Sequence, residues 1–214
     1  MNSTVIAEAM EYVNELFRGE YSGHDASHTM RVYRMAKRLA EKERADVCVS
    51  CLAALLHDVD DVKLSPETSA ELGRARHFLC VHGISEEETD RICTIIREIS
   101  FRGSDSVVPS TAEGKCVQDA DRLDAIGAIG IARTFAFGGS RGRTMHDPDI
   151  PPKLNMSEEE YRKCESTSLN HFYEKLFLLK YMMNTKSARE IAGCRDSYMR
   201  GFVNEFLSEW EGEN

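Results

Sequence analysis

Two histidines and two aspartates stand at three separated places where the surrounding pattern predicts buried helix faces. They are His28, the adjacent pair His57 and Asp58, and Asp121. Burying two carboxylates without partners would be prohibitive, whereas a divalent cation neutralises both and accepts neutral imidazole nitrogens. We therefore predict that the four side chains converge on one metal ion. Taken singly, each has a plainer explanation, because a lone helical histidine is more often a hydrogen-bonded core or surface residue.

The predicted ligand set limits the chemistry and the metal. Four protein ligands leave an octahedral ion two open positions, enough for one water molecule and one phosphoryl oxygen, as a hydrolytic metal requires. Mixed nitrogen and oxygen donors suit manganese, iron, cobalt, nickel or zinc better than magnesium, which stays an alternative. We predict one divalent ion, with manganese or iron preferred.

Other polar residues are candidates for catalysis and for substrate binding. His24 lies one turn before His28 and is a candidate proton donor or phosphate contact, unless it caps or orients its neighbours. A net-acidic protein must place positive charge locally to attract phosphate. The candidates for that role are Lys63, Arg141, Arg143 and Lys175, with simple solvation as the alternative for the arginines.

Helical periodicity predicts the elements that carry the first half of the site. One amphipathic helix runs from Ser3 to Phe17, and a second runs from about Asp25 to Lys42 with His28 on its core side. Asp46 fits the N-cap of a third helix that ends near Asp58. The pairs and runs typical of helix starts predict two more helices, at Ser65-Pro66 and at Ser85–Glu88.

The second half of the chain is predicted to be helical as well. The segment Val117–Phe135 is apolar almost all round and predicts one helix through the middle of a bundle. Capping-box patterns at Ser157–Glu160 and Ser187–Glu190 predict a C-terminal helical pair over residues 158–211. The glycine- and proline-rich stretch 137–157 is too irregular for a helix, and we interpret it as a loop-rich lid.

No segment alternates like a strand, and no long repeat is present. We therefore predict an all-α fold, an irregular helical bundle without substantial sheet, in a single domain over residues 1–214.

Composition and charge narrow the partners and the compartment. The chain is 42% hydrophobic and 29% charged, and its net charge of -9 opposes binding to a nucleic-acid polymer. No signal-peptide pattern and no membrane-spanning apolar run are visible, so we expect a cytoplasmic protein that binds a small phosphorylated substrate rather than a membrane. A homodimer is compatible with the sequence.

The seven cysteines are an odd number on mostly apolar helix faces, which favours reduced thiols over a disulfide framework. Cys48 and Cys51 form an isolated Cys-x-x-Cys pair. Such a pair can be a redox or zinc half-site, but no second pair follows and no strand precedes it. We therefore favour core packing for both residues.

The order of the metal-type residues resembles a known signature. His28, then Leu55-Leu56-His57-Asp58, then Ala120-Asp121-Arg122-Leu123 resembles the H…HD…D pattern of the HD-domain phosphohydrolase superfamily. The segments around His28, from Asp119 to Arg133 and over His171–Leu176 also resemble a subgroup of small, stand-alone bacterial HD hydrolases, so the likeness covers nearly the whole chain. The resemblance implies an all-α HD bundle, metal ligation by the four residues, and phosphate esters, often nucleotides, as substrates.

The resemblance also assigns roles to individual residues. It selects Asp121 rather than Asp119, which lies two positions away and hence on nearly the opposite side of a helix. Asp61 matches an acidic residue that assists hydrolysis in related nucleotide pyrophosphohydrolases, although a plain helix-end or loop carboxylate is an equal alternative. His171 joins the substrate-binding candidates, because tyrosines and histidines near the site could stack a base.

One departure from the subgroup leaves other functions open. Where the subgroup has His-Ser-Phe, this chain has Ile99-Ser100-Phe101. Extra histidines build a second metal site in two-metal HD enzymes, but without one at position 99 we assign His77 and His82 to the surface or core. The leading hypothesis is a metal-dependent phosphohydrolase. The alternatives are a nucleotide-binding sensor without catalysis and, less favoured, a di-iron HD-type oxygenase.

Overall fold

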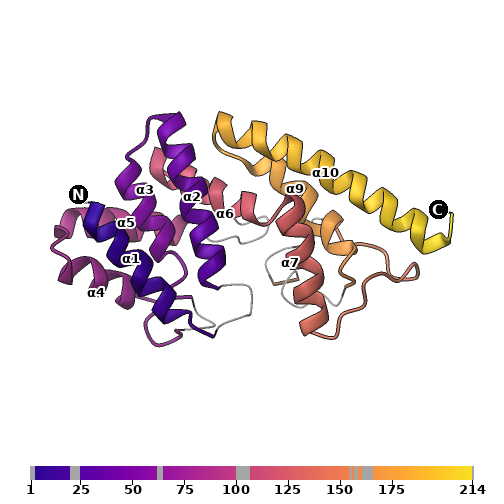
Figure 1. Cartoon of the computed structure of the whole chain (residues 1–214), viewed down its shortest axis with the longest axis horizontal. Helices are drawn as coiled ribbons and strands as arrows, with labels where there is room; N and C mark the ends of the chain where they lie inside the picture. Colours follow the sequence, from indigo (N-terminus) through magenta and orange to yellow (C-terminus); the bar gives the residue numbers. More distant parts are fainter. Residues whose placement is uncertain are drawn as a thin grey trace. The chain divides into compact units, whose positions relative to one another are not determined.

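The computed structural model describes residues 3–19, 25–61, 65–99, 107–154, 156, 159–160 and 166–213. Every regular element in these ranges is helical, and none is a strand (Figure 1). The predicted all-α class is therefore confirmed. No helix in the described ranges is long and apolar enough to cross a membrane.

The chain separates into two compact units. The first contains Met1–Ser100 and Val107–Asp121, and the second contains Arg122–Asn214. All four predicted metal ligands fall in the first unit. The organisation of the whole chain as a single functional domain stays a prediction.

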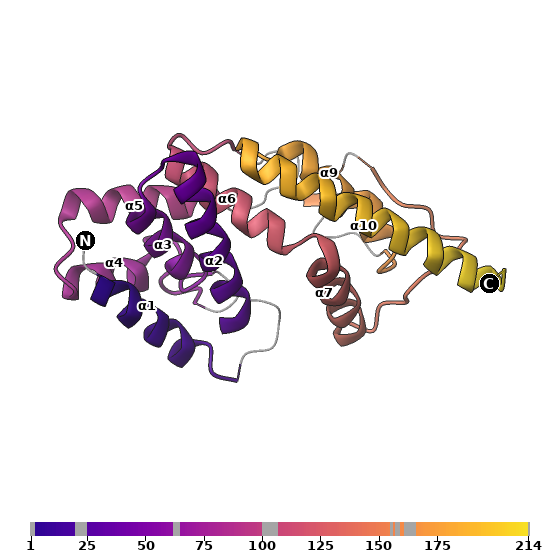
Figure 2. The same ribbon diagram turned by 45° about the horizontal axis from the view of Figure 1, so that its top comes forward.

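The first unit is built around one apolar helix. Its elements are α1 (Ser3–Leu16), α2 (Ala26–Glu43), α3 (Val47–Leu56), α4 (Gly73–Val81), α5 (Glu86–Ile99) and most of α6 (Ala112–Asp124). Helix α3 packs against α1, α2 and α5, and α4 packs against α5 (Figure 2). All residues from Val49 to Leu56 are buried, as expected for a short helix that is hydrophobic on every side.

Aspartate caps fix the starts of the helices next to the site. Asp25 precedes α2, and its carboxylate accepts a hydrogen bond of 2.7 Å from the backbone N–H of His28. Asp46 caps α3 by accepting from the backbone N–H groups of Cys48 at 2.9 Å and Val49 at 3.1 Å. The predicted N-cap of the third helix is confirmed, and these caps fix where α2 and α3 begin.

The helix predicted to start at Ser65-Pro66 begins later. Helix α4 starts at Gly73, and the stretch before it forms turns. The prediction was wrong because the Ser65 hydroxyl donates backwards to the carbonyl of Val59, at 3.1 Å, instead of capping a helix ahead of it. In contrast, Ser85 does cap α5, since its Oγ accepts from the backbone N–H of Glu88 at 3.3 Å.

The single helix predicted over Val117–Phe135 is two helices. Helix α6 ends at Asp124, and α7 (Gly127–Ser140) follows after a short break. Gly127 has a φ of 80°, a conformation that favours glycine. At this break the guanidinium of Arg195 donates to the carbonyl of Leu123, one of the last in α6. Apolar residues continue through the break, but α7 does not run through the interior as predicted, because its buried residues are Gly127, Gly130 and Gly138 and its Ile129 and Phe137 side chains are exposed.

The second unit contains α7, an irregular helical stretch and the long helix α10 (Lys186–Glu211). The irregular stretch passes from a π-helix, Phe172–Leu176, through α9 (Phe177–Leu179) to a 3-10 turn, Lys180–Met182. Helices α7 and α10 pack together, and rings of Phe135, Phe172, Phe202 and Phe206 contact one another in the core.

Two details of the C-terminal pair differ from the prediction. The last helix is capped by Thr185, whose hydroxyl accepts from the backbone N–H of Ala188 at 3.2 Å, so the helix begins before Ser187. Helical spacing of the apolar residues predicts that Cys194 and Tyr198 share one buried face of this helix, but both side chains are exposed. The buried positions are Ala188, Ala192, Asp196, Met199 and Val203. Of the other predicted helix start, Ser157 lies outside the described residues.

The predicted lid region is partly helical and partly held in place. Residues 137–140 belong to α7, so the irregular chain begins only at Arg141. Beyond it, backbone hydrogen bonds join Ser168 N–H to the Thr144 carbonyl at 3.0 Å and Leu169 N–H to the Met145 carbonyl at 2.9 Å. The side chain of Asn170 donates to the Ile150 carbonyl at 2.7 Å. The segment is therefore tied to the chain that follows it, and a lid function stays a prediction.

The Cys-x-x-Cys pair lies in the first turns of α3, where Cys51 is fully buried and Cys48 is half-buried. Burial raises the pKa of the Cys48 thiol, and it raises the pKa of Cys51 to about 12. A thiol with a raised pKa is a poor nucleophile and a poor metal ligand at neutral pH. The structure agrees with core packing for this pair.

Candidate metal centre

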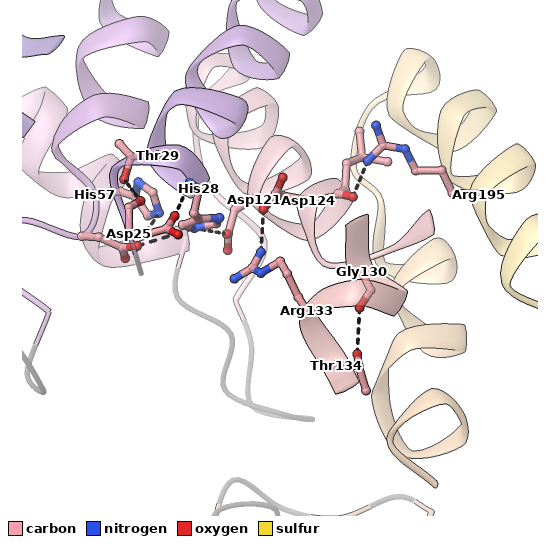
Figure 3. A network of polar contacts seen from close by, with 12 residues as sticks. Asp25, His28, Thr29, His57, Asp121, Asp124, Gly130, Arg133, Thr134 and Arg195 are labelled. Carbon is pink, nitrogen blue, oxygen red and sulfur yellow. Dashed lines mark hydrogen bonds and ion pairs between the residues drawn. The ribbon is translucent and has the colours of Figure 1, made fainter. Parts of the chain in front are cut away.

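Three helices bring the four predicted metal-type residues together, and Figure 3 shows His28, His57 and Asp121 close to one another. His28 lies in the first turn of α2, His57 and Asp58 follow the end of α3, and Asp121 lies near the end of α6. Donor atoms of His28, His57 and Asp58 all lie within 4.8 Å of one another. Two residues of the HD-type signature that are 93 positions apart along the chain, His28 and Asp121, are thereby neighbours in space.

Nε2 of His28 lies at the centre of this arrangement. It is 3.5 Å from Oδ2 of Asp58 and 3.5 Å from Oδ1 of Asp121. Nε2 of His57 is 3.2 Å from the same oxygen of Asp58. Donor atoms at about 2.1 Å from one shared ion lie roughly 3 Å apart. The observed separations therefore suit a common cation.

His57 is held in the orientation and tautomer that a metal ligand needs. Its Nδ1 is 2.8 Å from the backbone carbonyl of Ala54, one turn earlier in α3, and must carry the proton to donate there. The other nitrogen, Nε2, then keeps its lone pair. Within the described chain this buried atom has no aligned hydrogen-bond partner, although Asp58 is near. A buried nitrogen in this state is costly unless something accepts its lone pair.

The electrostatics of the cluster also fit a cation. Burial lowers the pKa of His57, but the charges of Asp58 and Asp121 and the hydrogen bonds to Asp58 and Ala54 outweigh it, and the pKa rises to about 9. The cluster therefore favours positive charge at neutral pH. The two imidazoles and two carboxylates fit one divalent ion by donor chemistry, by spacing and by charge.

Asp119 faces away from this cluster, as the helical spacing predicted. It is fully buried on the opposite side of α6, whereas the side chain of Asp121 is 29% exposed. Partial exposure leaves Asp121 accessible to a ligand that arrives from solvent. Helix geometry therefore places Asp121, and not Asp119, on the side of the cluster.

His77 and His82, also in the first unit, lie elsewhere. His77 is exposed on α4. His82 follows that helix, where its Nδ1 is 2.7 Å from the Phe78 carbonyl and its Nε2 is 3.5 Å from a carboxylate oxygen of Glu8. Both are where the sequence analysis assigned them. Ile99 is the last residue of α5 and is packed in the core, so an apolar side chain fills the position where the subgroup has histidine.

The two aspartates after Asp58 have different surroundings. Asp60 is 4% exposed, and its carboxylate accepts backbone hydrogen bonds from Arg74 at 3.1 Å and Ala75 at 2.9 Å. Asp61 is half-buried, and its backbone bonds to Asp58 and Ser65 close the turn. Only Asp61 keeps enough exposure to meet a substrate, so its predicted catalytic role stays open.

Three of the predicted substrate-binding residues lie close together in the second unit. Burial lowers the pKa of His171, the positive charges of Lys175 and Arg143 lower it further, and it falls to about 3. His171 is therefore neutral beside two cations. Arg141 is exposed at the end of α7, with its guanidinium 5.5 Å from the centre of the Phe137 ring. His24 and Lys63 lie outside the described residues.

Sequence reasoning missed the residues that hold the ligands in place. It did not identify the carboxylate of Asp60 as a helix cap or the Ser65 hydroxyl as an anchor of the same turn. For the cap by Asp60, the one available signal is that Leu72, directly before α4, has no side chain that could cap the helix. The partner of an uncapped helix still could not be located without the fold.

Comparison with known proteins places the chain in a family. The sequence profile of the HD domain matches residues 25–126, which include all four clustered residues. YpgQ of Bacillus subtilis (strain 168) is 39% identical over 203 residues, which cover 94% of this chain and 91% of YpgQ. The chain belongs to the HD-domain superfamily of hydrolases.

Solved structures agree with this assignment. An HD-superfamily hydrolase from Bacillus thuringiensis has a TM-score of 0.77 at 42% identity, with 97% of each chain covered. A protein of Lactobacillus plantarum has a TM-score of 0.85 at 37% identity, covering 99% of this chain and 98% of that one. Bacillus subtilis YpgQ in complex with ADP has a TM-score of 0.77 at 35% identity, covering 98% of this chain and 100% of YpgQ.

Proposed function

We propose that this protein is a divalent-metal-dependent phosphohydrolase that acts on a nucleotide or a related small phosphorylated metabolite. The observation that carries the proposal is the cluster of His28, His57 and Asp58, with Asp121 next to it and the buried Nε2 of His57 at 3.2 Å from Asp58. Membership of the HD hydrolases supports hydrolysis as the reaction class. The ADP complex of YpgQ supports a nucleotide as the substrate class.

In this proposal the four clustered residues hold one ion, and the protein supplies orientation and charge. A bound divalent cation would supply Lewis acidity toward a phosphoryl oxygen and would make water more acidic. His28 and His57 offer neutral nitrogens, with the His57 tautomer fixed by Ala54. Asp58 and Asp121 offset the cation's charge. The mixed donor set favours manganese or iron, then cobalt, nickel or zinc, over magnesium.

In this proposal Asp61 handles protons, and residues of the second unit bind the charge of the substrate. Asp61 accepts a proton from the attacking water, because it is the half-exposed carboxylate in the turn that carries Asp58. Arg143 and Lys175 bind the phosphate of the substrate, and neutral His171 beside them is suited to contact a base or a phosphoryl oxygen. His24, Lys63 and Arg141 remain candidates by sequence for the same tasks.

Metal removal and reconstitution test the proposal directly. The purified protein is stripped with a chelator and assayed for phosphate or pyrophosphate release from nucleoside mono-, di- and triphosphates and sugar phosphates. We expect no release from the stripped protein, restoration by at least one of manganese, iron, cobalt, nickel, zinc or magnesium, and about one ion per chain by elemental analysis.

The same assay separates the competing functions. Nucleotide binding without turnover of any compound would point to the sensor. Two iron ions per chain with oxygen consumption would point to the oxygenase. Turnover that persists after complete metal removal would contradict the proposal.

Substitution of the cationic residues tests how substrate is held. We expect Arg143→Ala and Lys175→Ala each to raise KM by about tenfold or more, because a hydrogen bond to a charged group contributes roughly 1.5–3 kcal/mol. The value of kcat should change less, since these residues bind the ground state as well as the transition state. Lys186→Ala is the control, because Lys186 is an exposed lysine of the same unit. Equal KM values for all three variants would remove the cationic cluster from the site.

A further inference from the structure

The turn that carries Asp58 is anchored by an unusual helix cap. Helix α4 begins after Leu72, a residue with a φ of 54° and a side chain that cannot accept a hydrogen bond. The first N–H groups of a helix need acceptors, and these normally come from the N-cap side chain. Here the acceptor comes from Asp60, thirteen positions before the first residue of the helix.

The geometry of this contact is that of a complete cap. Oδ1 of Asp60 accepts from the backbone N–H of Arg74 at 3.1 Å, and Oδ2 accepts from that of Ala75 at 2.9 Å. These are the second and third residues of α4, the positions that a local cap would serve. Both carboxylate oxygens are used, and the charge lies at the positive end of the helix. The side chain of Asp60 is thus fixed at both oxygens and buried.

Other hydrogen bonds fix the backbone on both sides of Asp60. Asp58 is two residues earlier, and the carbonyl of Val59, between them, accepts from the Ser65 hydroxyl at 3.1 Å. Asp61 N–H donates to the Asp58 carbonyl at 3.1 Å, and the Asp61 carbonyl accepts from Ser65 N–H at 2.8 Å. The turn is therefore anchored on both sides of Asp60, and Asp60 ties it to the N-terminus of α4.

We propose that Asp60 is a positioning residue that sets the metal affinity of the site by docking the His57–Asp61 turn onto the N-terminus of α4. This inference rests on the proposed function, because it requires the cluster to bind a metal. Its role differs from that of the ligands. Both oxygens of Asp60 accept backbone N–H groups of α4, so in this proposal Asp60 acts through the orientation of Asp58 and not as a ligand.

The test compares two caps of the same chemistry. Asp46 also accepts two backbone N–H groups at a helix start, but it lies at the opposite end of α3 from His57. The variants Asp60→Ala, Asp60→Asn, Asp46→Ala and Asp46→Asn are purified without metal. Their melting temperatures are measured, and manganese is titrated into each variant and the wild type by calorimetry.

We expect both alanine variants to lose a few degrees of melting temperature in the metal-free state, as loss of a helix cap requires. Asp60→Ala should also weaken manganese binding by about 10- to 100-fold, the usual effect of removing support from a metal ligand. Asp60→Asn keeps one acceptor oxygen and should fall between Asp60→Ala and the wild type. The Asp46 variants should bind manganese as the wild type does.

The outcomes separate this inference from the proposed function. Absence of manganese binding by the wild type would contradict the metal site itself. Wild-type binding with equal affinity in the Asp60 and Asp46 variants would show that Asp60 only caps α4, and would overturn the inference. If Asp60→Ala does not fold, the same comparison is made with Asp60→Asn and Asp46→Asn, which preserve side-chain shape.

Discussion

Replacement of Asp58 by alanine is expected to abolish metal binding and, with it, phosphohydrolase activity. The carboxylate of Asp58 lies within 3.5 Å of both imidazole nitrogens, and it is buried. Its removal leaves the cation with less charge to offset its own and breaks the contact that joins α2 to the end of α3. We expect metal affinity to fall by more than about 100-fold, beyond what the loss of a supporting residue costs. Elemental analysis and activity assays measure both effects.

The control for this variant is a carboxylate of the same unit that is far from the chemistry. Asp90 on α5 is exposed and pairs with Arg76 at 2.7 Å, so Asp90→Ala changes the net charge equally. Because Asp58 helps to raise the pKa of His57, Asp58→Ala should lower the stability of the metal-free protein, so its folded state is verified by circular dichroism before metal analysis. Full metal occupancy in Asp58→Ala would contradict the ligand assignment.

Substitution of Asp61 should separate catalysis from metal binding. If Asp61 accepts the proton of the attacking water, Asp61→Asn should lower kcat by roughly 10²- to 10⁴-fold, the range for loss of a general base. Metal occupancy should be unchanged, because the backbone groups of Asp61 hold the turn through their hydrogen bonds to Asp58 and Ser65. Steady-state kinetics at saturating metal, with elemental analysis of the same sample, measure the two quantities.

A conservative substitution gives a further check on Asp61. Asp61→Glu retains a base and should recover part of the activity. A variant Asp61→Asn with wild-type kcat would leave Asp61 as a plain turn residue, and the proton acceptor would have to be sought elsewhere.

The sequence predicted the helical class and the residues that converge because both depend on local pattern. The placement of His28 on the core side of α2 follows from helical periodicity, and the choice of Asp121 over Asp119 follows from their spacing on one helix. The convergence of the three segments could be predicted because their buried polar residues need partners, and a shared cation would satisfy all of them.

What the sequence did not predict depends on contacts between distant segments. The break between α6 and α7 could not be seen in the sequence because apolar residues continue through it. In the structure it is marked by the positive φ of Gly127. The start of α4 was misplaced because Ser65, the expected cap, anchors the preceding turn instead. The cap is supplied by Asp60, which is distant along the chain. Such pairings are set by tertiary structure, which overrides local capping preferences.

The burial of α3 has a consequence for how the centre opens. Eight consecutive residues of this helix are buried, so their amides can exchange with solvent only when the surrounding unit comes apart. His57 and Asp58 follow the end of that buried segment, whereas His28 lies in the first turn of α2, whose start is held by the cap from Asp25. If the centre holds an ion as proposed, we expect the His57–Asp58 half to be the part that local opening disturbs least.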